Sequence, residues 1–459
     1  MDMHGLSLTN RDDIKRARVL VVGLGRSGTA VARFLLRAGA KVVACDENPA
    51  ALGSKPVTHL REAGIKITRR PESAAVDWAV VSPGISGTHP LIKVLRRRSI
   101  PVVGELDLAS RFVPGPIVAV TGTNGKSTTT ALTARMLESA GKRVFCGGNL
   151  VPGKPLSSAL LAGPKDFYVV EVSSFQLERT HWLKPNVAVV LNITADHLNR
   201  HGTVLRYADC KLRILDRQDQ YDYAVLNRDD LLVYAARTRG RSQKHFFSMG
   251  RHTADAYFAD EALWADGRKV LPVRELKLPG MHNVQNSLAA VATVRLLGVS
   301  LPAIRLALRT FAGLPHRLEH VRRLNDVDYI NSSMTTNPAA GAKSLETVAG
   351  GRVAGGVVLI AGGREKALPT AEYVRAMKKY AKWVILVGES STRIAQELAA
   401  LGFSRFEVLL DLRSAVIAAQ KKTRPGDAVL FAPGFASFDQ FRDFEARGEA
   451  FSREVSNLD

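Results

Sequence analysis

Residues 121–128 have the types and the order that bind the phosphates of a nucleotide. They read TGTNGKST and lie between an apolar run (117–120) and a helical pattern (131–137). In such a loop, backbone N–H groups and the helix N-terminus face the phosphates, Lys126 adds a positive charge, and Ser127 offers a hydroxyl to Mg²⁺. The stretch therefore predicts a phosphate-binding loop between a strand and a helix.

The spacing of the two glycines departs from the general phosphate-loop pattern. Only Thr123 and Asn124 separate Gly122 from Gly125, whereas the general pattern has a longer insert. The alternative interpretation is a helix start in which Gly, Ser and Thr serve only as caps. We favour phosphate binding, because Gly-Lys-Ser directly after an apolar strand is uncommon by chance.

A second glycine loop lies nearer the N-terminus. GLGRSG (23–28) follows the apolar run 18–22, and Asp46 ends the next apolar run, 41–45. This is the GxGxxG fingerprint of a dinucleotide-binding βαβ unit, with an acid about 20 residues further on. The motif offers backbone donors to a diphosphate and a carboxylate to a sugar or base, so it predicts a nucleotide diphosphate. An NAD-dependent oxidoreductase remains open at this point.

Polar residues follow two further predicted strands of the central region. Glu171 ends the strand at 167–170, and His197 lies just beyond the strand at 187–191. The carboxyl ends of parallel strands meet at one edge of a sheet, where the phosphate loop also lies. Oxygen ligands suit Mg²⁺, so we expect a magnesium site there. Alternatively, Glu171 is a helix N-terminal acid and His197 a turn histidine.

The order of elements predicts an α/β protein of three domains. Strands and helices alternate along the chain, which is typical of parallel sheets. We expect a Rossmann-like domain at 1–104, a central P-loop ATPase domain at 105–313, and a C-terminal Rossmann-like α/β domain at 314–459. The length of 459 residues suits about three domains.

The composition limits the classes of function. The chain is 46% hydrophobic and 23% charged, with 64 basic and 43 acidic residues and a net charge of +21. The basic residues are scattered and no basic tract carries interleaved aromatics. We expect a basic surface that favours anionic substrates, and no nucleic-acid partner. A nucleic-acid-dependent ATPase is the corresponding alternative.

The sequence predicts no membrane insertion. No apolar run approaches the roughly 20 residues of a spanning helix, and the N-terminal residues lack the apolar segment of a signal peptide. Cys45, Cys146 and Cys210 are far apart and lack metal-ligand spacing. We therefore expect a reducing, cytoplasmic location.

These motifs together resemble the Mur ligases of peptidoglycan synthesis, over essentially the whole chain. The short-spaced phosphate loop followed by EVSSFQL is specific to that ligase group, and the C-terminal motif is similar to that of its glutamate-adding member. The motifs that carry the resemblance are GLGRSG (23–28), SPGI (82–85), TGTNGKST (121–128), EVSSFQLE (171–178), NITADHLNRHG (192–202), GLPHRLE (313–319) and ASFDQFRDFEARG (436–448).

The resemblance implies an ATP-dependent amide ligase that adds D-glutamate to UDP-N-acetylmuramoyl-L-alanine through an acyl phosphate. It implies ATP and two Mg²⁺ ions as cofactors, and a monomer. The first domain would then hold the UDP of the substrate and not NAD. A folylpolyglutamate synthetase is a related alternative, but the resemblance argues against it because that family begins with its ATPase domain.

The resemblance also implies a role for individual residues. Those expected around ATP are Gly122, Thr123, Asn124, Gly125, Lys126, Ser127, Thr128, Asn286 and Arg317. Those expected around the UDP substrate are Ser27, Asp46, Gly84, Asn149 and Gln176. Those expected around the incoming amino acid are Lys366, Ser437 and Phe444. Those expected around magnesium are Ser127, Glu171, Ser173, His197 and Lys211.

Lys126, His197 and Lys211 are the residues that the resemblance makes catalytic. Lys211 matches the lysine that carries a carbamate in the family, a modification that turns a cation into an oxygen-donor anion. Tyr207 lies one helical turn before it.

The chain departs from the family pattern at one segment. Ser332 and Met334 stand where the family usually has Asp and Lys near the nucleotide. A lost cation there weakens a charge-assisted contact normally worth about 1.5–3 kcal/mol, and Arg364 is a candidate to replace it. The departure leaves an L-glutamate-adding variant open.

Overall fold

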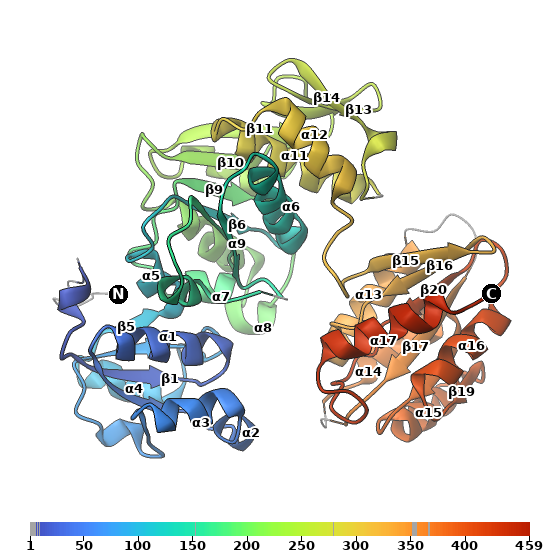
Figure 1. Cartoon of the computed structure of the whole chain (residues 1–459), viewed down its shortest axis with the longest axis horizontal. Coiled ribbons are helices and arrows are strands. Elements are labelled where there is room, and N and C mark those ends of the chain that lie inside the picture. The colour runs from blue at the N-terminus through green and yellow to red at the C-terminus, as the bar shows by residue number, and fades with distance from the viewer. Residues whose placement is uncertain are drawn as a thin grey trace. The chain divides into compact units, whose positions relative to one another are not determined.

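The computed structural model describes residues 6, 8, 10–151, 153–278, 280–350, 356–365 and 368–459. The chain forms two compact units, Met1–Phe311 and Ala312–Asp459. Each unit is an α/β structure, as the alternation of strands and helices predicts (Figure 1). Lys366 lies outside the described residues.

The first unit begins with a five-stranded parallel sheet. Its order is β3-β2-β1-β4-β5, with every pairing parallel. The strands are β1 (Arg18–Val22), β2 (Lys41–Cys45), β3 (Lys66–Ile67), β4 (Trp78–Val81) and β5 (Val102–Gly104). The helices are α1 (Arg26–Arg37), α2 (Pro49–Leu52), α3 (Lys55–Glu62), α4 (Pro90–Arg97) and α5 (Glu105–Ser110). The apolar runs of β1 and β4 are buried on both faces, which is the pattern of central parallel strands.

A nine-stranded sheet completes the first unit. Its order is β14-β13-β12-β11-β10-β9-β6-β8-β7, parallel except for the β12–β13 and β13–β14 pairs. The strands are β6 (Ile117–Thr121), β7 (Val144–Gly148), β8 (Phe167–Glu171), β9 (Val187–Val190), β10 (Tyr223–Asn227), β11 (Gln243–Ser248), β12 (Ala256–Ala259), β13 (Ala262–Ala265) and β14 (Arg268–Pro272). The carboxyl ends of β6, β8 and β9 lie side by side, because β6 pairs with both of the others.

Helices cover this sheet and shape its functional edge. α6 packs against α11 and α12 through a shared apolar core, and the three lie together beside the sheet in Figure 1. The helices are α6 (Lys126–Ser139), α7 (Ser174–Leu177), α8 (Leu198–His201), α9 (Val204–Leu212), α10 (Leu231–Ala235), α11 (Met281–Leu296) and α12 (Leu301–Thr310).

The second unit is a six-stranded sheet with helices on both faces. Its order is β15-β16-β20-β17-β18-β19, and only the β15–β16 pair is antiparallel. The strands are β15 (Glu319–Leu324), β16 (Val327–Asn331), β17 (Val357–Gly362), β18 (Ala381–Val387), β19 (Phe406–Val408) and β20 (Ala428–Phe431). The helices are α13 (Pro338–Gly350), α14 (Ala371–Tyr380), α15 (Ser391–Ala400), α16 (Leu412–Lys422) and α17 (Phe444–Ser456).

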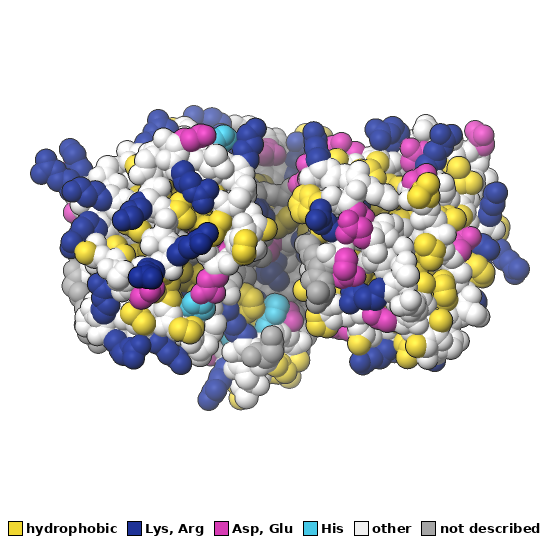
Figure 2. All heavy atoms as spheres, turned by 90° about the horizontal axis from the view of Figure 1, so that it is seen from below, with side chains coloured by type: hydrophobic (Ala, Val, Ile, Leu, Met, Phe, Trp, Pro, Cys, Tyr) yellow, Lys and Arg dark blue, Asp and Glu magenta, His cyan; other side chains and the backbone are white. Residues whose placement is uncertain are grey.

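The basic residues are dispersed over the surface. On the face that Figure 2 shows, Lys and Arg side chains are spread over the surface, some singly and some in small groups, and acidic side chains stand between some of them. Among the described residues, no helix combines the length and the apolar character that crossing a membrane requires.

Candidate functional site

The phosphate loop joins β6 to α6 and is held in shape by the neighbouring segment 192–194. The backbone N–H of Asn124 donates to Asn192 Oδ1 at 2.8 Å, and the N–H of Thr123 donates to the Asn192 carbonyl at 2.8 Å. Gly122 and Gly125 have φ values of +156° and +81°, which other residues rarely adopt. The sequence therefore needs glycine at both ends of the loop.

Asn286, which the sequence predicts at the ATP site, lies directly against this loop. A Cβ atom on Gly125 would come within 2.2 Å of Asn286 Oδ1. The two residues are 161 positions apart, and α11 brings them together by packing against α6. The loop and Asn286 therefore belong to one site.

A chain of hydrogen bonds runs from the phosphate loop to the end of β8. Ser127 Oγ donates to one oxygen of the buried Glu171 carboxylate, at 2.5 Å. Asn149 Nδ2 donates to the other oxygen at 2.7 Å. Glu171 thus joins a residue predicted at the ATP site to one predicted at the UDP site.

The side chain of Lys211 is buried behind the same loop. Its exposed fraction is 1%, and its Nζ donates to the Gly122 carbonyl at 2.7 Å. Burial, and then the positive charge of Lys126, lower the pKa of Lys211 to about 7, because both disfavour a second cation there. Lys126 Nζ itself donates to the Thr123 carbonyl at 2.8 Å.

His197 and Ser173 lie near Glu171 and Lys211. Among the hydrogen bonds described for this part of the chain, none joins His197 or Ser173 to those two side chains. His197 caps α8 with φ +50°, and its ring lies 4.8 Å from the Phe175 ring. Ser173 caps α7 and bonds to Gln176 in a capping box. Within the described part of the chain, no cluster of three or more His, Cys, Asp or Glu side chains could hold a metal ion.

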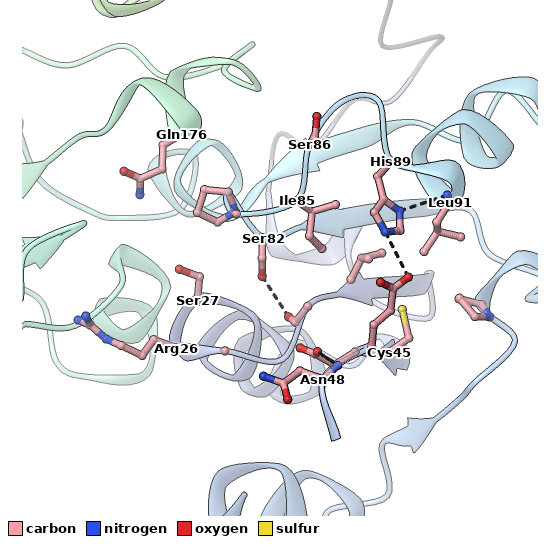
Figure 3. Close-up of a pocket in the computed structure, with 18 of the residues that line it drawn as sticks. Arg26, Ser27, Cys45, Asn48, Ser82, Ile85, Ser86, His89, Leu91 and Gln176 are labelled. Atoms are coloured by element: carbon pink, nitrogen blue, oxygen red, sulfur yellow. Dashed lines mark hydrogen bonds and ion pairs between the residues drawn. The ribbon is translucent and has the colours of Figure 1, made fainter. Parts of the chain in front are cut away.

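The residues predicted around the UDP substrate line one cavity of about 890 Å³. The cavity opens over the carboxyl ends of β1, β2 and β4, and α7 contributes Gln176 to it (Figure 3). The predicted residues in its wall are Ser27, Asp46, Gly84, Asn149 and Gln176. Five segments that are distant in sequence are thus brought together around one space.

The carboxylate of Asp46 accepts two backbone N–H groups in the structure. One carboxylate oxygen accepts the backbone N–H of Leu24 at 2.5 Å, and the other accepts the N–H of Asn48 at 2.8 Å. The carboxylate therefore fixes the glycine loop against the end of β2. Burial raises the pKa of the neighbouring Cys45 thiol to about 12, so this cavity residue is a protonated thiol at neutral pH.

The remaining predicted residues lie in the second unit. Arg317 is exposed and follows the buried His316, whose ring contacts the Phe444 ring edge-on at 6.4 Å. Ser333 Oγ donates to the Phe444 carbonyl at 2.8 Å. Ser437 is buried within the loop between β20 and α17. Within this unit, Phe444 thus lies beside the segments that carry Arg317 and Ser333.

The segment that departs from the family pattern is part of this arrangement. Ser332 is buried and its hydroxyl contacts that of Ser344 at 3.1 Å. The backbone N–H of Met334 donates to the His316 carbonyl at 3.1 Å. Arg364 is exposed and pairs with Ala436 in an isolated bridge, so the candidate replacement cation lies beside the Ser437 loop.

Two arginines that the sequence analysis did not single out are prominent in the structure. Arg200 donates to Glu178 and to carbonyl groups of the loop 83–85. Arg447 is buried and donates to Ser333 and to the Phe435 carbonyl. Both lie inside motifs that the sequence shows, but only the fold reveals what they contact.

Three family models match consecutive parts of the chain. The N-terminal domain of the MurD-like Mur ligases matches residues 17–104, the Mur ligase middle domain matches 120–294, and the glutamate ligase domain of Mur ligases matches 316–435.

Curated relatives match along almost their whole length. A UDP-N-acetylmuramoylalanine–D-glutamate ligase of Pelotomaculum thermopropionicum is 41% identical, covering 97% of this chain and 99% of the relative. A ligase of the same name from Geobacter metallireducens is 39% identical over 97% of this chain and 98% of the relative.

Solved structures share the fold. The UDP-N-acetylmuramate–alanine ligase MurC of Thermotoga maritima superposes with a TM-score of 0.57 at 21% identity, covering 96% of this chain and 99% of that chain. The MurF ligase of Thermotoga maritima in complex with ADP gives 0.52 at 18% identity, covering 98% and 97%. None of these matches supports an NAD-dependent oxidoreductase, which the glycine loop 23–28 had left open.

Proposed function

This chain belongs to the Mur ligase family, and on that premise we propose that it is an ATP-dependent ligase that adds D-glutamate to UDP-N-acetylmuramoyl-L-alanine. One observation carries the proposal. The five residues expected around the UDP substrate line one cavity, and Glu171 connects that cavity, through Asn149 and Ser127, to the phosphate loop. A substrate with a nucleotide diphosphate at one end and a carboxylate at the other suits this pairing of sites.

The proposed reaction has two steps. A carboxylate oxygen of the substrate attacks the γ-phosphorus of ATP, the bond to the β-phosphate oxygen breaks, and ADP leaves an acyl phosphate. The amine of glutamate then attacks the acyl carbon, loses a proton, and expels inorganic phosphate as the amide forms. The loop N–H groups and Lys126 stabilise the charge on the transferred phosphoryl group, so the protein acts mainly by positioning and electrostatics.

Magnesium fits the donor set of the phosphate-loop site. Ser127 and Glu171 offer hard oxygen donors beside the loop, and Mg²⁺ prefers such ligands together with phosphate oxygens. When bound, Mg²⁺ would neutralise phosphate charge. We propose two ions, with Ser173, His197 and Lys211 completing their surroundings.

A carbamate on Lys211 is consistent with the surroundings of that side chain. The neutral amine adds to CO₂ and releases a proton, which leaves an anion in place of a cation. Burial and Lys126 favour the neutral amine at pH 7, so the environment supports the modification.

We propose the domain limits 1–104, 105–313 and 314–459, and a monomer that works in the cytoplasm, where ATP is available. Arg317, Lys366, Ser437 and Phe444 would bind ATP and glutamate from the last domain. The loss of the family Asp and Lys at Ser332 and Met334 makes L-glutamate the second candidate for the added amino acid.

The deciding experiment measures ADP release by the purified protein with Mg²⁺, ATP and UDP-N-acetylmuramoyl-L-alanine, against a panel of D- and L-amino acids. We expect release with D-glutamate and none when the UDP substrate is omitted. If none of the amino acids in the panel gives ADP release, the proposed ligase activity is refuted. Release with L-glutamate alone would keep the ligase and reverse its stereochemistry.

A further inference from the structure

Arg200 connects the wall of the nucleotide cavity to the central domain. Its guanidinium donates to the carbonyls of Pro83, Gly84 and Ile85 at 3.3–3.4 Å, and all three residues line the cavity. Ile85 appears among the labelled residues of the cavity wall in Figure 3. The loop 83–85 is therefore held from outside the cavity by a side chain of α8.

The guanidinium of Arg200 is itself held in place. It makes a two-point ion pair with Glu178, at 2.8 Å and 2.6 Å, and its side chain is 14% exposed. A paired, largely buried guanidinium has one preferred orientation, because its planar fork fixes the direction of every donor. The ion pair thus holds the Arg200 side chain in one orientation, unlike a mobile surface side chain.

Arg200 also contacts the surroundings of His197. The guanidinium lies 4.4 Å from the centre of the Phe175 ring, within the range of a cation–π contact. The same ring lies 4.8 Å from the His197 ring. In addition, the Arg200 backbone N–H donates to the His197 carbonyl at 2.9 Å. One residue therefore contacts the cavity loop on one side and the support of His197 on the other.

His197 needs such support. Its φ of +50° lies in the left-handed region, where a residue other than glycine is retained only when its surroundings impose the conformation. The helix that follows, α8, has only four residues, too few to be stable by itself. The contacts of Arg200 contribute to this constraint, together with the bond of the His197 N–H to Asp196 and the neighbouring Tyr207 ring.

We propose that Arg200 is a positioning residue. It holds the cavity loop 83–85 and the Phe175 ring at the same time, so that nucleotide binding in the cavity is coupled to the position of the His197 ring. The inference rests on the proposed function, since it gives His197 its importance. Without the guanidinium, the loop loses three hydrogen bonds from two nitrogens and keeps the bond from Arg179 to the Ile85 carbonyl. The Phe175 ring beside His197 loses its cation–π contact. The affinity for the nucleotide should then fall, and the His197 ring should lose its fixed position, in the same variant.

Arg200→Met tests this, with Arg213→Met as the matched control. Arg213 also donates two guanidinium hydrogen bonds to carbonyls of the same region, those of Glu178 and Thr180, at 3.0 Å each. It contacts neither the loop 83–85 nor Phe175 in these hydrogen bonds. Arg200→Lys keeps the charge and loses the fork, so it should recover part of the function.

The first readout needs no ligase activity. UDP is titrated into protein with labelled histidines, and the imidazole signal of His197 is assigned by its absence from His197→Gln. We expect UDP to shift this signal in the unchanged protein and in Arg213→Met. In Arg200→Met we expect about tenfold weaker UDP binding and no shift of the His197 signal at saturation.

The second readout is kinetic. We expect Arg200→Met to lower kcat about tenfold and to raise KM for the UDP substrate about tenfold, with KM for ATP unchanged. Equal UDP affinity and an equal His197 shift in Arg200→Met would overturn the proposal, and so would identical losses in Arg213→Met. If the unchanged protein shows no ligase activity, the proposed function fails, while the UDP titration still decides the role of Arg200.

Discussion

The two glycine loops of the first unit share the order strand, loop, helix but differ in what surrounds them. Each follows a buried parallel strand and begins a helix, β1 and α1 for the loop at 23–28, β6 and α6 for the loop at 122–125. The first loop faces a cavity of about 890 Å³. At the second loop, side chains of the protein form hydrogen bonds within and beside the loop itself.

The contacts around the two loops show the difference. Beside the first, Asp46 takes up the Leu24 N–H and leaves the space over Ser27 open. Beside the second, Lys126 donates to the loop's own Thr123 carbonyl, and Ser127 donates to Glu171. Groups that would bind phosphate are therefore bonded to the protein.

The difference indicates how each ligand is accommodated. The first site is formed in advance, so its ligand needs little rearrangement and loses little free energy to ordering. At the second site, the ATP that we propose would have to exchange internal hydrogen bonds for bonds to its phosphates. Each exchange is nearly neutral in free energy, so the charge of Lys126 should carry much of the gain.

Lys126→Ala is the largest test of this comparison. Removing a preorganised cation from a phosphoryl-transfer site should lower ADP release about 10³-fold, because nothing else in the loop carries a full positive charge. UDP affinity should remain that of the unchanged protein, since Lys126 does not line the cavity. Lys142→Ala, at an exposed position just beyond α6, is the control and should leave both unchanged.

The outcome that contradicts the comparison is a joint loss. If Lys126→Ala weakens UDP binding as much as it slows ADP release, the two loops form one coupled site. Isothermal titration with UDP and a coupled ADP assay distinguish the two cases.

The buried Lys211 gives a second test, through the dependence of stability on pH. Its folded pKa of about 7 lies below the ordinary 10.5. Between these values the unfolded chain binds a proton that the folded chain does not, so stability rises with pH across this window and is lowest below pH 7. From pH 7 to pH 9 this lysine should add about 2 kcal/mol to the free energy of unfolding.

Lys211→Met should lack that increase. Urea unfolding of both proteins is measured at several pH values in buffer freed of CO₂, so that no carbamate forms. The quantity of interest is the difference between the two curves, because it removes the contribution of other titrating groups. Parallel curves would mean that Lys211 is solvated and that its burial beside the phosphate loop has no effect on the pH dependence of stability.

Much of this arrangement is predictable from sequence, because it depends on local patterns. Apolar runs such as 18–22 and 41–45 become β1 and β2 with the predicted limits, since parallel strands are buried on both faces. The glycine spacing identifies the first loop, and the Gly-Lys-Ser sequence after an apolar strand identifies the second. Glu171 at the end of β8 and His197 beyond β9 lie at the predicted edge. The family resemblance adds the roles of single residues.

The rest depends on contacts between distant segments. β15 reads EHVRRL and has no apolar run, so only its pairing with β16 makes it a strand. Asn286 comes to lie against Gly125 only because α11 packs against α6. The links through Arg200 likewise join residues more than a hundred positions apart. No local pattern encodes these contacts.

The most local test places the same small group in both loops. In Gly125→Ala the new methyl would meet Asn286 Oδ1, at a φ of +81° that alanine avoids, so stability should fall by about 1–3 kcal/mol. In Gly25→Ala the methyl meets nothing within 4 Å and φ is −69°, so stability should change by less than about 0.5 kcal/mol. Because Gly25 lines the cavity, its methyl should instead weaken UDP binding several-fold. Thermal unfolding with and without UDP separates the two effects, and equal destabilisation by both changes would show that the first loop is packed as tightly as the second.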